Sequence, residues 1–316
     1  MKICVVGAGA IGSWIGGRLA LAGNDVSMIA RGETLQAIDT AGLRITDAGD
    51  TRCVAVAASA DPAELGAHDV VILAVKAPAL PDLAPSLGPL IAAETLIIPM
   101  LNGVPWWFTD EPLWSVDPEL HIADALPLEQ IAGCVVHASC FRSEPNHVTV
   151  KHADKLILGE PGGGSSERIE RLCELFTNSG IRCEESENVR RAIWYKLWGN
   201  ATINPMSALT RSTADKLLDE PTIRAFMAEA MDELAAIGAA IDCPISETSE
   251  DRMAVTARLG AFKSSMLQDV EAGRPIEVEA LLGAPREIAR SVGMKTPQLD
   301  RIYAMTRLMG DNLGLL

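Results

Sequence analysis

The sequence predicts an α/β fold whose first half is an open, doubly wound parallel sheet and whose second half is entirely helical. Short apolar runs alternate with helical patterns in the first half, a glycine-rich turn joins the first run to the first helix, and helical periodicity dominates from Asn188 onward. A chain of 316 residues is long enough for two domains, because single cores seldom grow past roughly 250 residues. We place the domains at 1–186 and 187–316.

The first elements are a strand, a turn and a helix. Residues 2–6 form a short apolar run stopped by glycine, and residues 11–22 carry apolar or small side chains at helical spacing. A second strand at 25–30 and a short helix at 33–41 follow. This order is typical of a parallel sheet with crossover helices.

Two further apolar runs, at 69–75 and 95–101, are continuous rather than alternating, as in parallel strands buried on both faces. The region 132–160 changes character, because its apolar runs are joined by polar turns typical of antiparallel pairing. We therefore expect antiparallel strands at 134–140, 147–151 and 155–159, then a helix at 167–179 and a last strand at 181–185.

The second half has almost no β-branched alternation and carries long segments of helical period. The predicted helices lie at 188–201, 206–212, 213–218, 220–241, 247–270 and 276–293. Helices 220–241 and 247–270 are apolar enough to offer a homodimer surface or to fill the domain's own core. The sequence leaves these two alternatives open.

The composition excludes several classes of protein. Apolar residues make up 48% and charged residues 22% of the chain, the balance of an ordinary soluble globular protein. The formal charge of −15 argues against nucleic acid as a partner, because following a phosphate backbone needs a broad basic face. No run reaches the roughly 18 apolar residues of a membrane span, and the first residues lack a signal-peptide pattern, so we expect no membrane association.

The cysteines and histidines indicate no disulfide framework and no metal site. The 7 cysteines are scattered, odd in number and without a C-x-x-C pair, which favours reduced thiols in the cytoplasm. His147 and His152 lie in a predicted hairpin without the cysteine or carboxylate pattern of a zinc site, so we expect no bound metal.

A glycine-rich segment follows the first predicted strand and opens the first predicted helix, the context that gives the pattern G-x-G-x-x-G its meaning. The first glycine permits a tight turn, the second lets backbone approach a pyrophosphate, and the third lets the helix pack on the strand. We therefore predict a Rossmann-type dinucleotide site. Its residues are Gly7, Ala8, Gly9, Ala10, Ile11 and Gly12.

Arg31 stands at the end of the second strand, where an acidic residue would accept hydrogen bonds from a ribose 2′-hydroxyl. A guanidinium can bind a 2′-phosphate but cannot accept a hydrogen bond from a hydroxyl group, so Arg31 favours NADP(H) over NAD(H). The alternative is a solvated loop cation. Lys76, at the end of strand 69–75, either contacts the cofactor's phosphates or is a solvent-facing lysine at a strand end.

Lys196, Asn200 and Asn204 recur every four residues and so line one face of an otherwise apolar helix. Polar groups on an apolar face are costly unless they are used. Because reducing a carbonyl with hydride leaves negative charge on oxygen, the lysine is a candidate proton donor. The alternative is a structural hydrogen-bond ladder in which Asn204 caps the next helix before Pro205.

These residues belong to a larger pattern. It comprises the N-terminal G-x-G-x-x-G, the run Lys-x-x-x-Asn-x-x-x-Asn-Pro from Lys196, Asn102-Gly103 after the fourth-strand region, and Ser264-Ser-Met-Leu-Gln-Asp269 followed by Gly-Arg-x-x-Glu277. With this pattern the chain resembles the ketopantoate reductase (2-dehydropantoate 2-reductase) family over essentially its whole length.

The resemblance implies a role for each of these residues. Lys196 corresponds to the general acid that protonates the C2 carbonyl oxygen, and Glu277 to the acidic residue that supports substrate and lysine. Glu279 is the alternative to Glu277, although it would point elsewhere on a helix. The implied substrate-binding residues are Asn102, Asn200, Asn204 and Ser265, and the implied cofactor contacts near the nicotinamide are Asn102 and Glu277.

Two features depart from the family's pattern. The segment Val104-Pro-Trp-Trp-Phe108, with Leu113 and Trp114, is longer and more aromatic, and either shapes a pocket or lid or packs the domain junction. Phe262 stands three residues before Ser265, where the family often has a polar amide. Both make the site more apolar than a small hydroxylated ketoacid requires.

We therefore expect an NADP-dependent oxidoreductase that reduces ketopantoate to pantoate, a step toward pantothenate and coenzyme A. One alternative is a paralogous reductase of another branched or aromatic 2-ketoacid, of the D-2-hydroxyacid dehydrogenase type. Another is a non-catalytic nucleotide-binding protein that kept the fold without turnover. The combination of Lys196, Asn102 and Glu277 argues against this last alternative.

Overall fold

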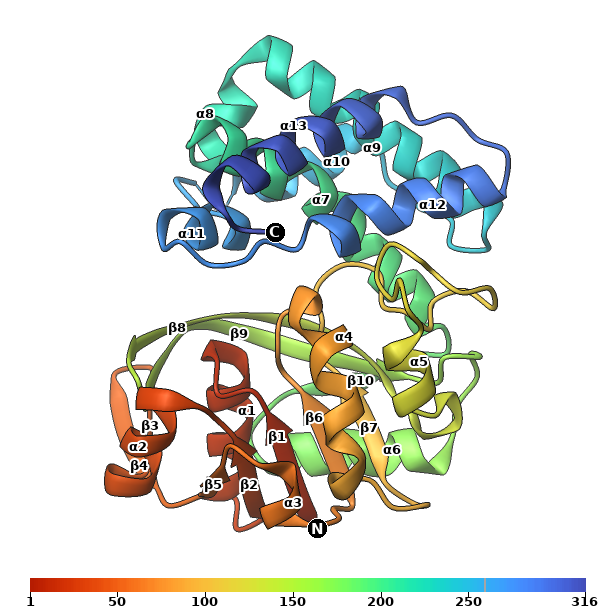
Figure 1. Cartoon of the computed structure of the whole chain (residues 1–316). Helices are drawn as coiled ribbons and strands as arrows, with labels where there is room; N and C mark the ends of the chain where they lie inside the picture. The colour runs from red at the N-terminus through yellow and green to blue at the C-terminus, as the bar shows by residue number, and fades with distance from the viewer. Residues whose placement is uncertain (259) are drawn as a thin grey trace. The chain divides into compact units, whose positions relative to one another are not determined.

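The structure is a computed structural model that describes residues 1–258 and 260–316 (Figure 1). Its internal contacts divide the chain into two units, each described by itself below. Unit 1 consists of Met1–Val75, Ala79–Leu101 and Leu120–Val189. Unit 2 consists of Lys76–Pro78, Asn102–Glu119 and Arg190–Leu316.

The first sheet of unit 1 is the open parallel sheet that the sequence predicts. Its strands, in spatial order, are β5 (Ala57–Ser59), β2 (Asp25–Ile29), β1 (Lys2–Val6), β6 (Val70–Leu73) and β7 (Leu96–Pro99). Every neighbouring pair is parallel. Because β2 and β6 flank β1 on opposite sides, the strand order reverses at β1, and ligands of open α/β sheets bind outside the carboxyl ends of strands at such a point.

A second sheet of unit 1 is larger than the sequence predicted. Its strands are β10 (Cys183–Glu185), β9 (His147–Gly159), β3 (Leu43–Asp47) and β4 (Asp50–Val54), with β8 (Gly133–Glu144) paired to β9. The β8–β9 pairing is antiparallel, as predicted, but the predicted strands 147–151 and 155–159 are one strand. The hairpin of β3 and β4 was missed because almost all of β4 is exposed and carries little apolar pattern.

Helix α1 (Ala10–Leu21) packs against strands of both sheets and is buried on most of its surface. Trp14, Ile15 and Leu19 enter the core of unit 1 from this helix. The packing is close at Gly17, where an added Cβ would lie 2.1 Å from Ile45 Cδ1 and would displace that side chain. The other helices of unit 1 are α2 (Gly32–Ala41), α3 (Pro62–Leu65), α4 (Leu80–Leu83), η2 (Ala84–Leu90), α5 (His121–Ala125), η3 (Leu128–Gln130) and α6 (Glu167–Asn178), while η1 (Ala77–Ala79) begins in unit 2.

From Arg190 onward the described part of unit 2 is mainly helical, as the sequence predicts for the second half. Its elements are α7 (Val189–Thr210), α8 (Ala214–Asp219), α9 (Pro221–Ala240), α10 (Ser249–Ala257), α11 (Ser265–Glu271), the π-helix η4 (Glu279–Gly283), α12 (Ala284–Ser291) and α13 (Pro297–Leu313). The first residue of α7 is counted with unit 1. No helix among the described residues is long and apolar enough to cross a membrane.

The helix predictions in unit 2 need three corrections. The predicted helices 188–201 and 206–212 are one helix, α7, which continues through Pro205 because tertiary packing outweighs the local cost of proline. The predicted helix 247–270 is two helices, α10 and α11, and its residue Leu259 lies outside the described residues. Helix α13 was not predicted, although Thr296-Pro297 is a typical start of a helix.

The indole groups of α7 show how this helix is held. Trp194 Nε1 donates to the Leu234 carbonyl at 3.0 Å, and Trp198 Nε1 donates to the Met231 carbonyl at 2.8 Å. Both indoles are buried, and both carbonyls belong to α9. The apolar face of α9 therefore serves the core of unit 2, while the homodimer surface stays a prediction.

Candidate active site

The glycine-rich turn lies at the carboxyl end of β1. Gly7 has φ +105°, and an added Cβ there would lie 2.8 Å from the Ala74 carbonyl oxygen. A Cβ on Gly12 would lie 2.0 Å from the Gly7 carbonyl oxygen. The fold therefore requires glycine at both positions.

Gly9 differs from these two glycines because the fold does not require it. Its backbone is extended, with φ −73° and ψ −173°, and an added Cβ would meet no atom closer than the Ala74 carbonyl oxygen at 3.9 Å. Its bare backbone leaves open space before the N-terminus of α1, where main-chain N–H groups favour an anion. The turn therefore fits a dinucleotide pyrophosphate.

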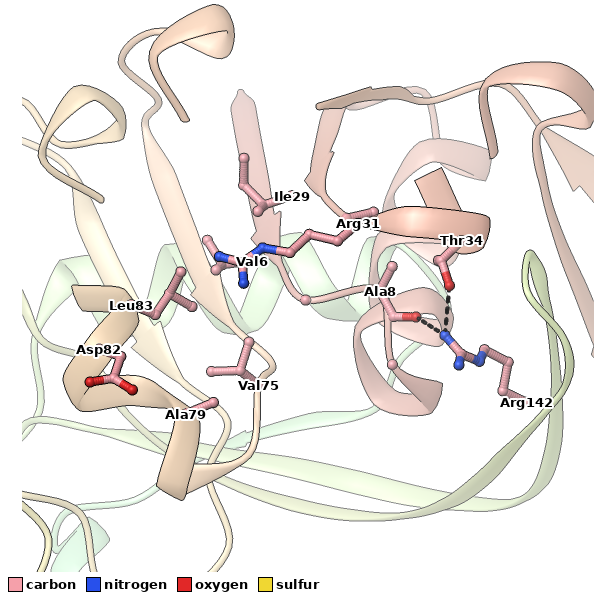
Figure 2. Close-up of a pocket in the computed structure, with 13 residues that line it drawn as sticks. Val6, Ala8, Ile29, Arg31, Thr34, Val75, Ala79, Asp82, Leu83 and Arg142 are labelled. Atoms are coloured by element: carbon pink, nitrogen blue, oxygen red, sulfur yellow. Dashed lines mark hydrogen bonds between the residues drawn. The ribbon is translucent and has the colours of Figure 1, made fainter. Parts of the chain in front are cut away.

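A cavity of about 480 Å³ opens beside this turn (Figure 2). Among the predicted cofactor residues, Gly7, Ala8, Gly9 and Arg31 line it. Ala10, Ile11 and Gly12 form the first turn of α1 and are not among its lining residues. The remaining lining residues are Val6, Ile29, Ala30, Thr34, Val75, Ala79, Asp82, Leu83 and Arg142.

Two arginines contribute positive charge to this cavity. Arg31 is exposed and occupies the N-cap position of α2. Arg142 reaches the cavity from β8, and its Nη1 donates to the Ala8 carbonyl at 3.3 Å and to Thr34 Oγ1 at 3.0 Å (Figure 2). The sequence did not point to Arg142, because it lies in a strand 134 residues after the turn and belongs to no local motif.

A second group of predicted site residues comes together in unit 2. Asn200 Nδ2 donates to Asn102 Oδ1 at 3.0 Å, and Asn102 Nδ2 donates to Glu277 Oε2 at 3.3 Å. The main-chain N–H of Ala77 donates to Glu277 Oε1 at 3.4 Å. Side chains from three distant segments thus form one hydrogen-bonded chain that ends on a carboxylate.

Burial raises the pKa of Glu277 above its ordinary value, and the charge of Asp269 raises it further. The charge of Lys76 and the hydrogen bonds from Asn102 and Ala77 act in the opposite direction, but burial dominates. The carboxyl group of Glu277 therefore holds its proton more tightly than a glutamate in water.

Lys196 is half-buried and lies one helical turn before Asn200 on α7. Asn204 lies one turn further on, is buried, and donates from Nδ2 to Ser265 Oγ at 3.4 Å. Ser265 is exposed at the start of α11. The alternative in which Asn204 caps a new helix is wrong, because α7 runs unbroken through Pro205.

Lys76 and Glu279 are engaged by other residues of unit 2. Lys76 Nζ forms an ion pair with Asp269 and donates to the Pro275 carbonyl at 2.8 Å. The cofactor contact predicted for Lys76 stays a prediction, because this residue is not among those that line the cavity beside the glycine-rich turn. Glu279 Oε1 accepts a hydrogen bond from Tyr303 Oη at 2.9 Å, which ties it to α13 rather than to the group around Glu277.

The aromatic segment packs inside unit 2. Trp106, Trp107 and Phe108 are buried, and the Phe108 ring stacks on Trp194 with 5.8 Å between centroids. Only Trp114 of this segment's rings is exposed. These contacts favour a packing role over a lid.

Comparison with known proteins places these features in a family context. A family model described as ketopantoate reductase PanE/ApbA matches residues 3–163, and the model of its C-terminal part matches residues 188–310. A 2-dehydropantoate 2-reductase of Mesorhizobium japonicum is 36% identical, and the match covers 99% of each chain.

Solved structures of other proteins are also similar to this chain. A protein of Ralstonia solanacearum MolK2, provisionally identified as a ketopantoate reductase, is 48% identical with a TM-score of 0.96, covering 100% of this chain and 99% of that one. D-mandelate dehydrogenase in complex with NADH and anilino(oxo)acetate has a TM-score of 0.87 over 100% of both chains. Its identity is 23%, so this likeness concerns the fold alone.

Proposed function

The chain belongs to the ketopantoate reductase family, an oxidoreductase family, and we propose that it reduces ketopantoate to pantoate with NADPH, a step toward pantothenate and coenzyme A. The observation that carries this proposal is the hydrogen-bonded chain from Asn200 through Asn102 to Glu277, with Lys196 one turn away on α7. A 2-ketoacid offers a carbonyl oxygen and a carboxylate, and such a group of amides, an ammonium and a hydroxyl can bind both.

The proposed cofactor is held by residues of unit 1. The main-chain N–H groups beside Gly9 would bind the pyrophosphate, and Arg31 would contact the adenosine 2′-phosphate. When bound, the nicotinamide supplies the hydride that reduces C2 of the ketoacid. The preference for NADPH rests on the absence of an acidic residue at position 31, after β2, where NAD-dependent Rossmann proteins carry one.

The chain's own residues supply proton, charge and orientation. Lys196 would donate a proton to the C2 oxygen as negative charge develops there. Asn102 and Asn200 would orient this oxygen, while Asn204 and Ser265 would hold the substrate carboxylate. In its ionised form, Glu277, fixed by Asn102 and the Ala77 N–H, would keep Lys196 charged when the site is desolvated.

A reductase of another branched or aromatic 2-ketoacid is the second candidate. The observation that favours it is Phe262, a half-buried ring three residues from Ser265. An apolar side chain near the carboxylate-binding serine suits a substrate with a larger apolar substituent better than the hydroxylated ketopantoate.

Replacing Lys196 tests the proposal. For Lys196→Ala, kcat for NADPH oxidation with ketopantoate should fall by about 10²- to 10⁴-fold, the usual contribution of a general acid. Binding of NADPH, measured by fluorescence titration, should stay within twofold of the wild type. The matched control is Lys216→Ala, an exposed lysine of α8, which should leave kcat unchanged. Unchanged kcat in Lys196→Ala would refute the mechanism.

A further inference from the structure

We propose that Arg142 is a specificity-determining residue that binds the adenosine 2′-phosphate, and that it makes the cofactor site selective for NADPH together with Arg31. The inference rests on the proposed function in one respect, because it takes NADPH to be the cofactor. It adds a residue from the second sheet of unit 1 to a site otherwise built on the first sheet.

The position of the Arg142 guanidinium identifies the part of the cofactor that it would meet. Its Nη1 contacts the Ala8 carbonyl, in the glycine-rich turn, and Thr34 Oγ1, in the first turn of α2 (Figure 2). In a Rossmann domain the adenosine ribose lies between these same two segments, because the end of the second strand contacts its 2′ position. The guanidinium is therefore fixed on the side of the cavity that receives the 2′ group.

The guanidinium keeps donors for a ligand. An arginine side chain has five N–H donors, and both hydrogen bonds of Arg142 come from Nη1. Within residues 1–258 and 260–316, no carboxylate forms an ion pair with Arg142. Its remaining donors can form the paired hydrogen bonds that a phosphate accepts.

Charge in the cavity also favours an anion beyond the pyrophosphate. The lining carries two arginines and one carboxylate, Asp82, in a chain whose net charge is −15. Figure 2 shows Asp82 on the opposite side of the cavity from Arg142. The positive charge of Arg142 is therefore available to a ligand rather than neutralised by a neighbouring acid.

The two arginines differ in how firmly they are held. Arg142 is anchored by two hydrogen bonds, whereas the Arg31 side chain forms neither a hydrogen bond nor an ion pair in the described part of the chain. A group fixed before binding loses less conformational entropy when it contacts the phosphate. Arg142 should therefore contribute at least as much as Arg31 to the preference for a 2′-phosphate.

Isothermal titration of the full chain with 2′,5′-ADP and with 5′-ADP tests the inference without relying on turnover. Wild type should bind 2′,5′-ADP more tightly than 5′-ADP. In Arg142→Gln, affinity for 2′,5′-ADP should fall by about 10- to 100-fold, the value of hydrogen bonds to a charged group. Affinity for 5′-ADP should change by less than twofold. Arg142→Lys keeps the positive charge but lacks the paired N–H donors of the guanidinium, so its affinity for 2′,5′-ADP should lie between those of the wild type and Arg142→Gln.

The control is Arg52→Gln, an exposed arginine of β4 whose Nε contacts Asp50 and which lies outside the cavity. It should leave both affinities unchanged, and circular dichroism should show all variants folded. Equal losses for both ligands in Arg142→Gln would overturn the inference by placing Arg142 at the pyrophosphate. An unchanged 2′,5′-ADP affinity, or a wild type without preference for 2′,5′-ADP, would overturn it as well.

Failure of this inference is distinguishable from failure of the proposed function. If the wild type reduces ketopantoate with NADPH while Arg142→Gln binds 2′,5′-ADP normally, only the role of Arg142 is refuted. If the titrations follow the expected pattern but ketopantoate is not reduced, the role of Arg142 stands and the substrate is wrong.

Discussion

At the scale of single residues, Glu277 links burial to protonation. Its pKa is raised by burial, so the folded chain binds this proton more tightly than the unfolded chain does. The stability that this proton contributes is complete at pH values below the unfolded pKa and is lost as pH rises through the folded pKa. Ionising Glu277 in the folded chain therefore costs folding free energy.

Glu277→Gln should remove this cost. The thermal unfolding midpoint of Glu277→Gln minus that of the wild type should increase by at least about 2 °C as pH rises from 4 to 8. The matched control is Glu94→Gln, an exposed glutamate, for which the difference should not grow with pH. A difference for Glu277→Gln that stays constant or shrinks with rising pH would contradict this account.

The sequence predicted most residues of the site but not all of their partners. Asn102, Asn200 and Glu277 were identified from a pattern spread over the chain, and the structure brings them together. The ion pair of Lys76 with Asp269 was not foreseen, because the two residues lie far apart and neither position by itself indicates the other. Arg142 was not predicted for the same physical reason: a strand residue meets distant segments of the chain only through folding.

At the scale of elements, the glycines of the glycine-rich turn differ in whether the fold requires them. Gly12 allows α1 to pack closely on the turn, whereas Gly9 has room for a side chain in the unliganded fold. The same sequence motif therefore contains one glycine that packing requires and one that packing does not require.

Two alanine substitutions should separate these roles. Gly12→Ala should lower the free energy of unfolding by about 1–3 kcal/mol or more, because the new methyl overlaps the Gly7 carbonyl. Gly9→Ala should change it by less than about 0.5 kcal/mol but weaken binding of 5′-ADP. Urea unfolding and calorimetric titration measure the two effects. A strongly destabilised Gly9→Ala, or one with normal 5′-ADP affinity, would refute this division.

Element boundaries were predictable where local signals were strong. Strand β1 and helix α1 follow from an apolar run, glycines and helical spacing. The β3–β4 hairpin and the continuity of α7 through Pro205 depend on tertiary contacts, which outweigh local propensity.

At the scale of the whole molecule, the chain combines a parallel-sheet unit with a helical unit, as the periodicity of its two halves indicates. The assignment of Lys76–Pro78 and Asn102–Glu119 to the helical unit could not be read from periodicity, because both segments follow strands of the first sheet. These short segments supply Asn102 and the Ala77 N–H to the group around Glu277. We propose that this group is the catalytic centre of a 2-ketoacid reductase.

The most direct test of this claim is a panel of 2-ketoacids assayed with the full chain, using NADPH and NADH separately. Ketopantoate, ketoisovalerate and phenylpyruvate cover the hydroxylated, branched and aromatic classes. The account predicts the highest kcat/KM for ketopantoate with NADPH. With NADH, which lacks the 2′-phosphate and its charged contacts, kcat/KM should be at least about tenfold lower. A kcat/KM for phenylpyruvate far above that for ketopantoate would contradict the named substrate, and equal values with NADPH and NADH would contradict the cofactor assignment.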